Sequence, residues 1–357
     1  LHLSIRRQRQ MCIRDRSYGL HAIVVNPAHM KAVPGRKTDV KDAEWIAELL
    51  QHGLLQPSYI PSKDQRELRE LVQYRKSLVG ERTRELNRLQ KMLEGANIKL
   101  SGTVTNINGK SARKILEYIL SGNEIDEKKY DEMYEEKLIA HNLKASKEQI
   151  LDDLKGFMSP LQRRMLKELL QHLDELNVHI ENLNDEIDNF MKPEEKQASQ
   201  VIQDVTGIGN TSAQTIIAVI GTDMERFPSD RHISSWAGLC PGDNVSAKKR
   251  KSGKIRKGNA LLKSTLVLCA HAAVRHKSSY FHAQFKRIST HRGKKRAYVA
   301  VAHSILIAIY HILKDGVKYQ DLGAEYYNQF NAERKIHAYL KKLKALGWEP
   351  PKEAVPA

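Results

Sequence analysis

The stretch Leu166 to Phe190, LKELLQHLDELNVHIENLNDEIDNF, decides the fold because its apolar residues repeat every seven positions. The two heptad positions are filled throughout, one by Leu166, Leu173, Ile180 and Ile187, the other by Leu169, Leu176, Leu183 and Phe190. Such a repeat predicts a long coiled-coil helix. We expect its apolar strip to be covered partly by another helix of the chain and partly by a second copy, giving a dimer or tetramer.

Further helices are predicted on both sides of this stretch. Leucines from Leu68 to Leu93 recur at helical spacing in a charged background that ends at Gly95. An N-cap at Thr38 opens a helix through Leu50 that Gly53 ends. Short helices are expected in 101–143, buried helices at 261–274 and 298–313, and a charged helix after Asn331. Only His21 to Asn26 (HAIVVN) favours a buried strand, so the chain is predicted to be mainly α.

Composition narrows the class of protein. The 357 residues suit two or three folding units, with 41% hydrophobic and 28% charged residues. Lys plus Arg number 59 against 42 Asp plus Glu, a net charge of +17. Such an excess indicates a nucleic-acid partner, the alternative being a merely basic soluble protein. No uncharged apolar stretch approaches the roughly 18 residues of a membrane span, and three scattered cysteines suit a reducing cytoplasm.

The first sixteen residues differ from the remainder. Residues 1–16 (LHLSIRRQRQMCIRDR) begin with Leu and show neither strand alternation nor a secretion signal. The run MCIRDR is similar to translated sequencing-adapter read-through. We expect a spurious prefix joined near Ser17 to an N-terminally truncated protein.

A glycine turn is predicted in the last third of the chain. Val205-Thr-Gly-Ile-Gly209 precedes an apolar helical stripe, which indicates a helix-hairpin-helix-like element. Gly207 and Gly209 would let backbone amides approach a DNA phosphate at a helix N-terminus. The alternative is an ordinary turn between two core helices.

The segment 236–259 (WAGLCPGDNVSAKKRKSGKIRKGN) is expected to form an irregular, flexible basic loop. Seven Lys or Arg lie between Lys248 and Lys257, and Lys248, Lys249, Arg250, Lys254, Arg256 and Lys257 are the predicted nucleic-acid contacts. Cations near Ser246 or Ser252 would stabilise the charge that develops when a serine attacks phosphorus. The alternative is a solvated loop without chemistry.

Two carboxylates open the predicted helix at residue 39. Asp39 and Asp42 are three residues apart, so both project from one face within reach of a single divalent ion. Magnesium prefers such oxygen ligands. The alternative makes Asp39 a helix-dipole partner and Asp42 a surface charge.

Several motifs occur in the order found in one family. They are Val25-Asn26-Pro27, Gly35-Arg-Lys-Thr-Asp-Val-Lys-Asp-Ala43, Gly53-Leu-Leu, Leu68-Arg-Glu-Leu71, Asn87-Arg-Leu-Gln90 and Lys99-Leu100, then Thr206-Gly-Ile-Gly209, Trp236-Ala-Gly-Leu-Cys-Pro241 and Lys257-Gly-Asn259. From about Ser17 to Tyr327 the chain resembles transposases of the insertion-sequence 110 family, whose C-terminal domain is related to Piv-type DNA invertases.

The resemblance implies a site and its partners. It implies a RuvC-like domain with an Asp-Glu-Asp-Asp set binding Mg²⁺, in which Asp39 and Asp42 match the last two acids. The first aspartate and the glutamate belong to upstream strands that are missing here, so this chain is expected to build only part of the metal site. Ser246 matches the nucleophilic serine, with Ser252 as fallback, although Ala247 stands where many relatives have Gly. Relatives break and rejoin double-stranded DNA under a non-coding guide RNA, with the two domains of one site supplied by different protomers.

The expected organisation follows from these motifs. Residues 17–62 would be the remnant of the RuvC-like domain, 63–192 the coiled-coil region, 193–327 the C-terminal transposase domain and 328–357 a charged tail. The protein would act in a prokaryotic cytoplasm at the nucleoid. Two other functions remain open: a RuvC-like junction nuclease using metal-activated water, and a non-catalytic scaffold that binds nucleic acid.

Overall fold

The computed structural model describes residues 18, 23, 25, 39–55, 60–123, 125–139, 145–241, 244–246, 249–252, 255–329 and 332–348. These residues form helices and one two-stranded hairpin, which confirms the prediction of a mainly α protein. The chain divides into two compact units, Leu1–Arg66 and Glu67–Ala357.

The first unit contains the helix predicted to carry the two acids. Helix α3 spans Asp39–Gln51, and Gly53 follows it with φ of 66°, a left-handed conformation that glycine adopts without strain. Within the predicted strand the structure describes Ile23, which is 39% exposed, and Val25, which forms a β-bridge. Thr38 and the rest of His21 to Asn26 lie outside the described residues.

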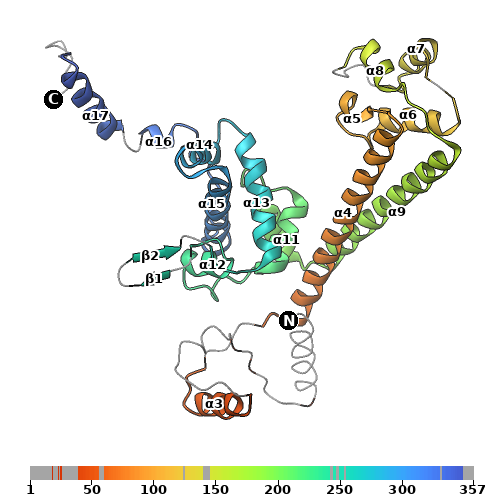
Figure 1. Cartoon of the computed structure of the whole chain (residues 1–357). Coiled ribbons are helices and arrows are strands. Elements are labelled where there is room, and N and C mark those ends of the chain that lie inside the picture. Colours follow the sequence, from red (N-terminus) through yellow and green to blue (C-terminus); the bar gives the residue numbers. More distant parts are fainter. Residues whose placement is uncertain are drawn as a thin grey trace. The chain divides into compact units, whose positions relative to one another are not determined.

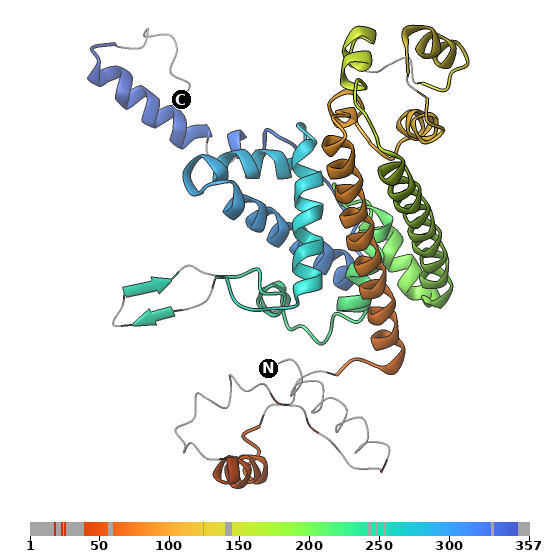
Figure 2. The same cartoon turned by 45° about the vertical axis from the view of Figure 1, so that its right-hand side comes forward.

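Two long antiparallel helices run side by side in the second unit (Figures 1 and 2). Helix α4 spans Lys63–Gly95 and helix α9 spans Pro160–Phe190. Arg75 donates to Asn184 at 3.0 Å, and Arg82 donates to Asn177 at 3.2 Å. The two pairs are one heptad apart on both helices, so the same contact repeats along the seam.

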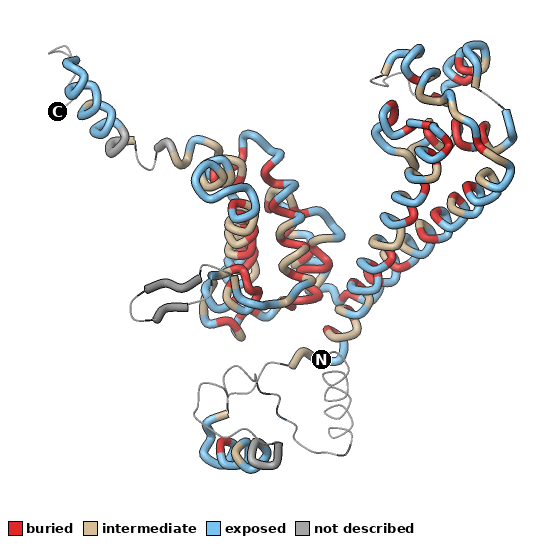
Figure 3. Tube along the Cα trace, viewed as in Figure 1, coloured by how far each residue is buried: buried red, intermediate tan, exposed pale blue. Residues whose placement is uncertain are grey.

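The heptad strip of α9 is largely buried by this pairing (Figure 3). Leu166, Leu173, Leu176, Leu183 and Ile187 are each at most 5% exposed. They share two hydrophobic cores with apolar residues of α4, among them Leu68, Val72, Leu78, Leu89 and Leu93. Covering by a helix of the same chain is therefore confirmed, while the oligomer stays a prediction.

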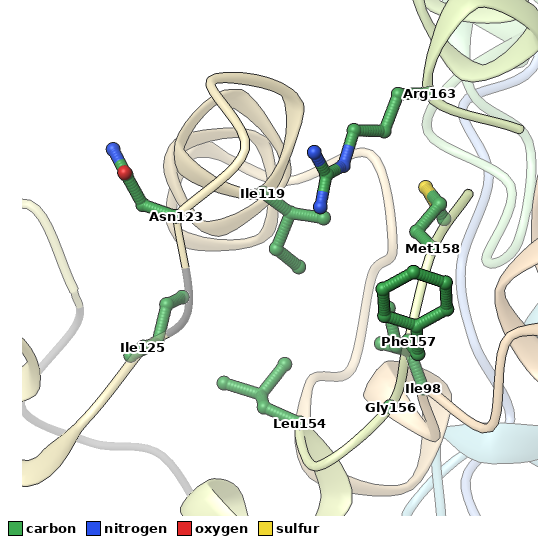
Figure 4. A pocket seen from close by; sticks show the side chains of 9 residues that line it. All are labelled: Ile98, Ile119, Asn123, Ile125, Leu154, Gly156, Phe157, Met158 and Arg163. Carbon is green, nitrogen blue, oxygen red and sulfur yellow. The ribbon is translucent and has the colours of Figure 1, made fainter. Parts of the chain in front are cut away.

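Four short helices close the far end of this pair: α5 (Leu100–Thr103), α6 (Lys110–Leu120), α7 (Glu127–Glu135) and α8 (Lys147–Asp153). The first three confirm the short helices expected in 101–143. A cavity of about 30 Å³ lies here. Figure 4 shows the residues that line it: Ile98, Ile119, Asn123, Ile125, Leu154, Gly156, Phe157, Met158 and Arg163. It has room for about one water molecule and no substrate.

The helices that follow α9 are α10 (Pro193–Ile202), α11 (Asn210–Ile220), α12 (Asp230–Trp236), α13 (Ala260–Arg275), α14 (Tyr280–Arg292), α15 (Lys294–Asp315), α16 (Tyr326–Gln329) and α17 (Ala332–Ala345). Helices α10 to α15 contribute to the core that also contains Leu183. The same core includes Leu68 and Ile187 of the long helices. This core thus draws residues from both sides of residue 192, and the predicted domain boundaries stay a prediction.

Helix α15 is the one helix of the described chain that is long and apolar enough to cross a membrane. By contrast, we expected no uncharged apolar stretch of about 18 residues from the sequence. In the structure α15 packs against α12, α13 and α14, and Tyr310 donates from its hydroxyl to the Phe227 carbonyl at 3.0 Å. This packing is typical of a core helix.

Candidate nucleic-acid interface

The predicted basic loop contains a β-hairpin. Strand β1 spans Asn244–Ser246 and pairs antiparallel with β2, Lys249–Ser252. The expectation of an irregular loop was wrong for these residues, since the pairing of Ser246 with Lys249 leaves only two residues between the strands, a length typical of tight hairpins. Lys248 and Lys254 lie outside the described residues.

The pairing register separates the two candidate serines. Ser246 ends β1 and pairs with Lys249, next to the pair of Val245 with Arg250. Ser252 ends β2 and pairs with Asn244, at the opposite end of the hairpin and beyond an irregularity in the register. The backbone thus places Ser246 at the far end of the hairpin, opposite Lys249, and Ser252 toward its base.

A glycine neck holds the base of this hairpin. We use this name for residues 237–241 and 255–258, where Pro241 bridges to Ile255 and the Arg256 amide donates to the Cys240 carbonyl at 3.2 Å. A Cβ on Gly258 would lie 2.4 Å from the Ala237 carbonyl carbon, and one on Gly238 would lie 2.8 Å from the Arg256 oxygen. Only glycine permits such a close approach of the two backbone segments, which is why positions 238 and 258 require glycine.

The neck leads directly into α13. Asn259 is its N-cap and accepts a hydrogen bond from the Leu262 amide at 3.0 Å. Arg256 and Lys257 are exposed beside this helix start, and Lys263 donates to the Arg256 carbonyl at 3.2 Å. Two predicted phosphate contacts are therefore fixed in place by backbone structure on both sides.

Cys240 lies in the neck but is not an activated nucleophile. Burial raises the pKa of its thiol, Asp230 raises it further, and the nearby Arg256 only partly opposes this. A raised thiol pKa disfavours the reactive thiolate.

The glycine turn is confirmed as a connection between two helices, and its two glycines have different surroundings. Gly207 has φ of 95°, and a Cβ on it would lie 2.5 Å from the Cys269 carbonyl oxygen of α13. Its lack of a side chain thus serves helix packing. Gly209 is exposed, is the N-cap residue of α11 and has no atom within 4 Å of an added Cβ. Of the two, Gly209 leaves space for a phosphate.

The acids Asp39 and Asp42 occupy the first turn of α3, as predicted. Their side chains lie outside what the structure describes, so their separation is a backbone statement only. Among the described residues, no group of three or more His, Cys, Asp or Glu could hold a metal ion.

A buried arginine that the sequence did not single out joins the long helices to the C-terminal core. Arg75 is 2% exposed and donates to Asn184, to Gln214 and to the Thr211 carbonyl. Burial lowers its pKa to about 10, although Asp188 favours the charged form. The signal in the sequence was the spacing of seven residues between Arg75 and Arg82, which places both arginines on the same face of α4.

A second missed residue supports the glycine turn. Asp321 accepts hydrogen bonds from the Thr206 hydroxyl at 3.3 Å and from the Tyr280 amide at 2.8 Å. The Gly323 amide and the Tyr319 hydroxyl also donate to it. Burial alone would raise its pKa, but these donors leave that pKa below its ordinary value. The carboxylate therefore ties the turn to α14 in its charged form.

Comparisons with known proteins agree with this arrangement. Residues 199–286, from α10 through the hairpin to α14, match the transposase family IS116/IS110/IS902. Residues 13–98 match the DEDD transposase domain of IS110 elements, a match that includes residues 13–16 of the expected prefix. Two separate matches in this order define the class of protein: a transposase of an insertion sequence.

Individual relatives narrow the kind of transposase that the chain resembles. The chain is 24% identical over 290 residues to the transposase for insertion sequence element IS1111A of Coxiella burnetii, covering 80% of this chain and 69% of that protein. It is 27% identical over 135 residues to an uncharacterized 43.6 kDa protein of insertion element IS110 of Streptomyces coelicolor, covering 36% and 31%. The two family matches and the IS1111A relative together support an IS110-family transposase.

Proposed function

We propose that this transposase breaks and rejoins double-stranded DNA with the Ser246 hydroxyl as nucleophile. The observation that carries the proposal is the hairpin on its glycine neck, which puts Ser246 at the end of a short strand opposite Lys249. A rigid neck and a basic hairpin favour a group that is presented to a phosphodiester. Family membership adds DNA recombination as the class of reaction.

The proposed step exchanges one phosphoester bond for another. The Ser246 oxygen attacks phosphorus and loses its proton, the bond from phosphorus to the 3′ oxygen breaks, and that oxygen takes up a proton. The products are a phosphoserine link and a free 3′ hydroxyl, which can reverse the step on another strand. Arg250, Arg256, Lys257 and the neighbouring lysines would neutralise the phosphate charge.

Asp39 and Asp42 would hold the divalent cation. Their i, i+3 placement at the start of α3 suits one or two carboxylate ligands of Mg²⁺, the remaining positions being filled by water and phosphate oxygens. When bound, the ion would polarise the scissile phosphate. The DEDD match supports a divalent metal without selecting the element.

Further partners follow from the same family. We infer that the protein acts as a homo-oligomer at the nucleoid, with a non-coding RNA choosing the DNA. The net charge of +17 supports a polyanionic partner but does not distinguish DNA from RNA.

Adduct trapping tests the proposal. The whole gene product, incubated with its element DNA, RNA and Mg²⁺, should yield a covalent protein–DNA complex that Ser246→Ala abolishes. Ser252→Ala is the matched control on the same hairpin and should keep the adduct. Unchanged cleavage by Ser246→Ala would favour a junction nuclease using water. A non-catalytic scaffold would yield no adduct, and its nucleic-acid binding would be unaffected by Asp39→Asn and Asp42→Asn.

A further inference from the structure

Helix α17 presents an apolar stripe to solvent. Ile336, Tyr339, Leu343, Leu346 and Trp348 lie on or just beyond this helix and are between 37% and 83% exposed. Four of them, from Ile336 to Leu346, follow helical spacing and occupy one face. A stripe of large apolar side chains is typical of a surface that another protein element covers.

The charge of α17 limits what can cover this stripe. Its fourteen residues contain five Lys or Arg and a single acid, Glu333. Pairing with a second α17 would bring like charges together along the seam, which opposes association. Nucleic acid would satisfy the lysines but leave the apolar face in water. The partner should therefore be a protein surface that is both apolar and acidic.

The chain itself carries such a surface on the outer side of α9. From Glu168 to Asp188 the helix has seven Asp or Glu and no Lys or Arg, in a protein with a net charge of +17. Asp174, Glu175, Glu181 and Asp185 are exposed around Val178, which is itself 53% exposed. These acids face away from the leucines buried against α4.

A groove between α6 and α9 gives this surface a shape. We define the acidic groove as a hollow of about 520 Å³ lined by Arg113, Glu117, Leu120, Lys167, Leu170, Gln171, Asp174, Glu175, Val178 and His179. Of its apolar residues, Val178 is exposed, Leu120 is half-buried and Leu170 belongs to the core, and its cations are Arg113 and Lys167. Arg113 is engaged by Asp174 at 2.6 Å, and the acids of α9 continue beyond the groove toward Asp185.

The short reach of α17 favours a second copy over the same chain as the source of the groove. Two residues separate α16 from α17, and the Tyr327 hydroxyl of α16 donates a hydrogen bond to the Tyr280 hydroxyl of α14 at 2.7 Å. From that anchor α17 extends about 21 Å at 1.5 Å per residue. The groove residue Leu170 lies about 27 Å along α9 from Asp188, and Asp188 contacts Gln214 of α11 in the C-terminal core. That distance along α9 is longer than α17 itself.

We propose that α17 of one copy docks in the acidic groove of another copy. Tyr339, Leu343 and Leu346 would cover Leu120 and Val178, while the basic residues of α17 complement the acids of α9. The contact is reciprocal or chain-forming according to the symmetry of the assembly.

Cross-linking between differently labelled copies tests this contact. A photoreactive amino acid replaces Tyr339 in a full-length chain, which is mixed with an isotopically heavy, unsubstituted chain. Mass spectrometry should find light-to-heavy cross-links to residues of α6 or α9. Cross-links confined to one chain, or to α17 of the second copy, would overturn the proposal, as would the absence of any cross-link to α6 or α9.

Charge reversal supplies the matched control. The triple change Lys341→Glu, Lys342→Glu, Lys344→Glu should lower the cross-link yield at least tenfold, and Glu175→Lys with Glu181→Lys in the heavy chain should restore it. Reversing Lys294 and Lys295 at the exposed start of α15 should leave the yield unchanged. If the α17 reversal instead weakens binding to DNA or to vesicles of anionic lipid and leaves the cross-link intact, α17 serves that surface and the proposal is wrong.

Discussion

Because backbone segments lie so close together in the glycine neck, we predict that replacing one neck glycine with alanine disrupts the hairpin. In Gly258→Ala the new Cβ would lie 2.4 Å from the Ala237 carbonyl carbon and oxygen, and 2.5 Å from the Gly238 nitrogen. Backbone must shift by about 1 Å to reach ordinary contact, at a cost of about 1–3 kcal/mol for overpacking. Ala237 and Leu239 on one side of the neck belong to the core, whereas residues 256–258 on the other side are exposed. We therefore expect the exposed side to give way, which opens the hairpin rather than unfolds the protein.

Two assays follow the neck. Limited proteolysis should cut Gly258→Ala near the hairpin faster than wild type, and DNA cleavage should fall about tenfold for each 1.4 kcal/mol by which the active geometry is disfavoured. Gly95→Ala is the matched control, because Gly95 has no atom within 4 Å of an added Cβ. Wild-type proteolysis and cleavage in Gly258→Ala would refute the role of the neck.

Three further changes have defined outcomes. Arg75→Met should lower the free energy of unfolding in urea by about 3–5 kcal/mol, because it leaves a buried polar network without its charged donor; an unchanged midpoint contradicts this. Asp321 has a lowered pKa in the folded protein, so its charged form adds stability above its unfolded pKa of about 3.8 that is lost as pH falls through the folded value. Asp321→Asn should flatten that acid limb in thermal scans, and an unaltered limb would exclude this contribution. Arg256→Ala and Lys257→Ala should each reduce the salt dependence of DNA binding by about one phosphate contact, and an unchanged slope would remove that residue from the interface.

Helix positions were predictable because periodicity and glycine punctuation are local. The leucines from Leu68 to Leu93 and the heptad ending at Phe190 predicted both long helices, and Gly53 and Gly95 marked helix ends. Which surface would cover the heptad strip was not predictable from the strip itself. That choice depends on α4 folding back, and the pairs joining Arg75 to Asn184 and Arg82 to Asn177 connect residues about 100 positions apart.

The candidate site was predictable in composition and less so in geometry. The basic run and its serines were visible, but lysines and arginines have little strand preference, which concealed the hairpin. Gly207 illustrates the same limit, since a glycine for phosphate approach and one for helix packing have the same sequence signature. Asp321 gave no signal because its donors come from three separate segments.

The central claim is that Ser246 forms the bond to phosphorus. Mass spectrometry of peptides from a nuclease-digested protein–DNA adduct tests it directly. The account predicts a nucleotide remnant on Ser246, with none on Ser252. A remnant on any other residue, or cleaved DNA whose 5′ phosphates have never been attached to protein, would contradict it.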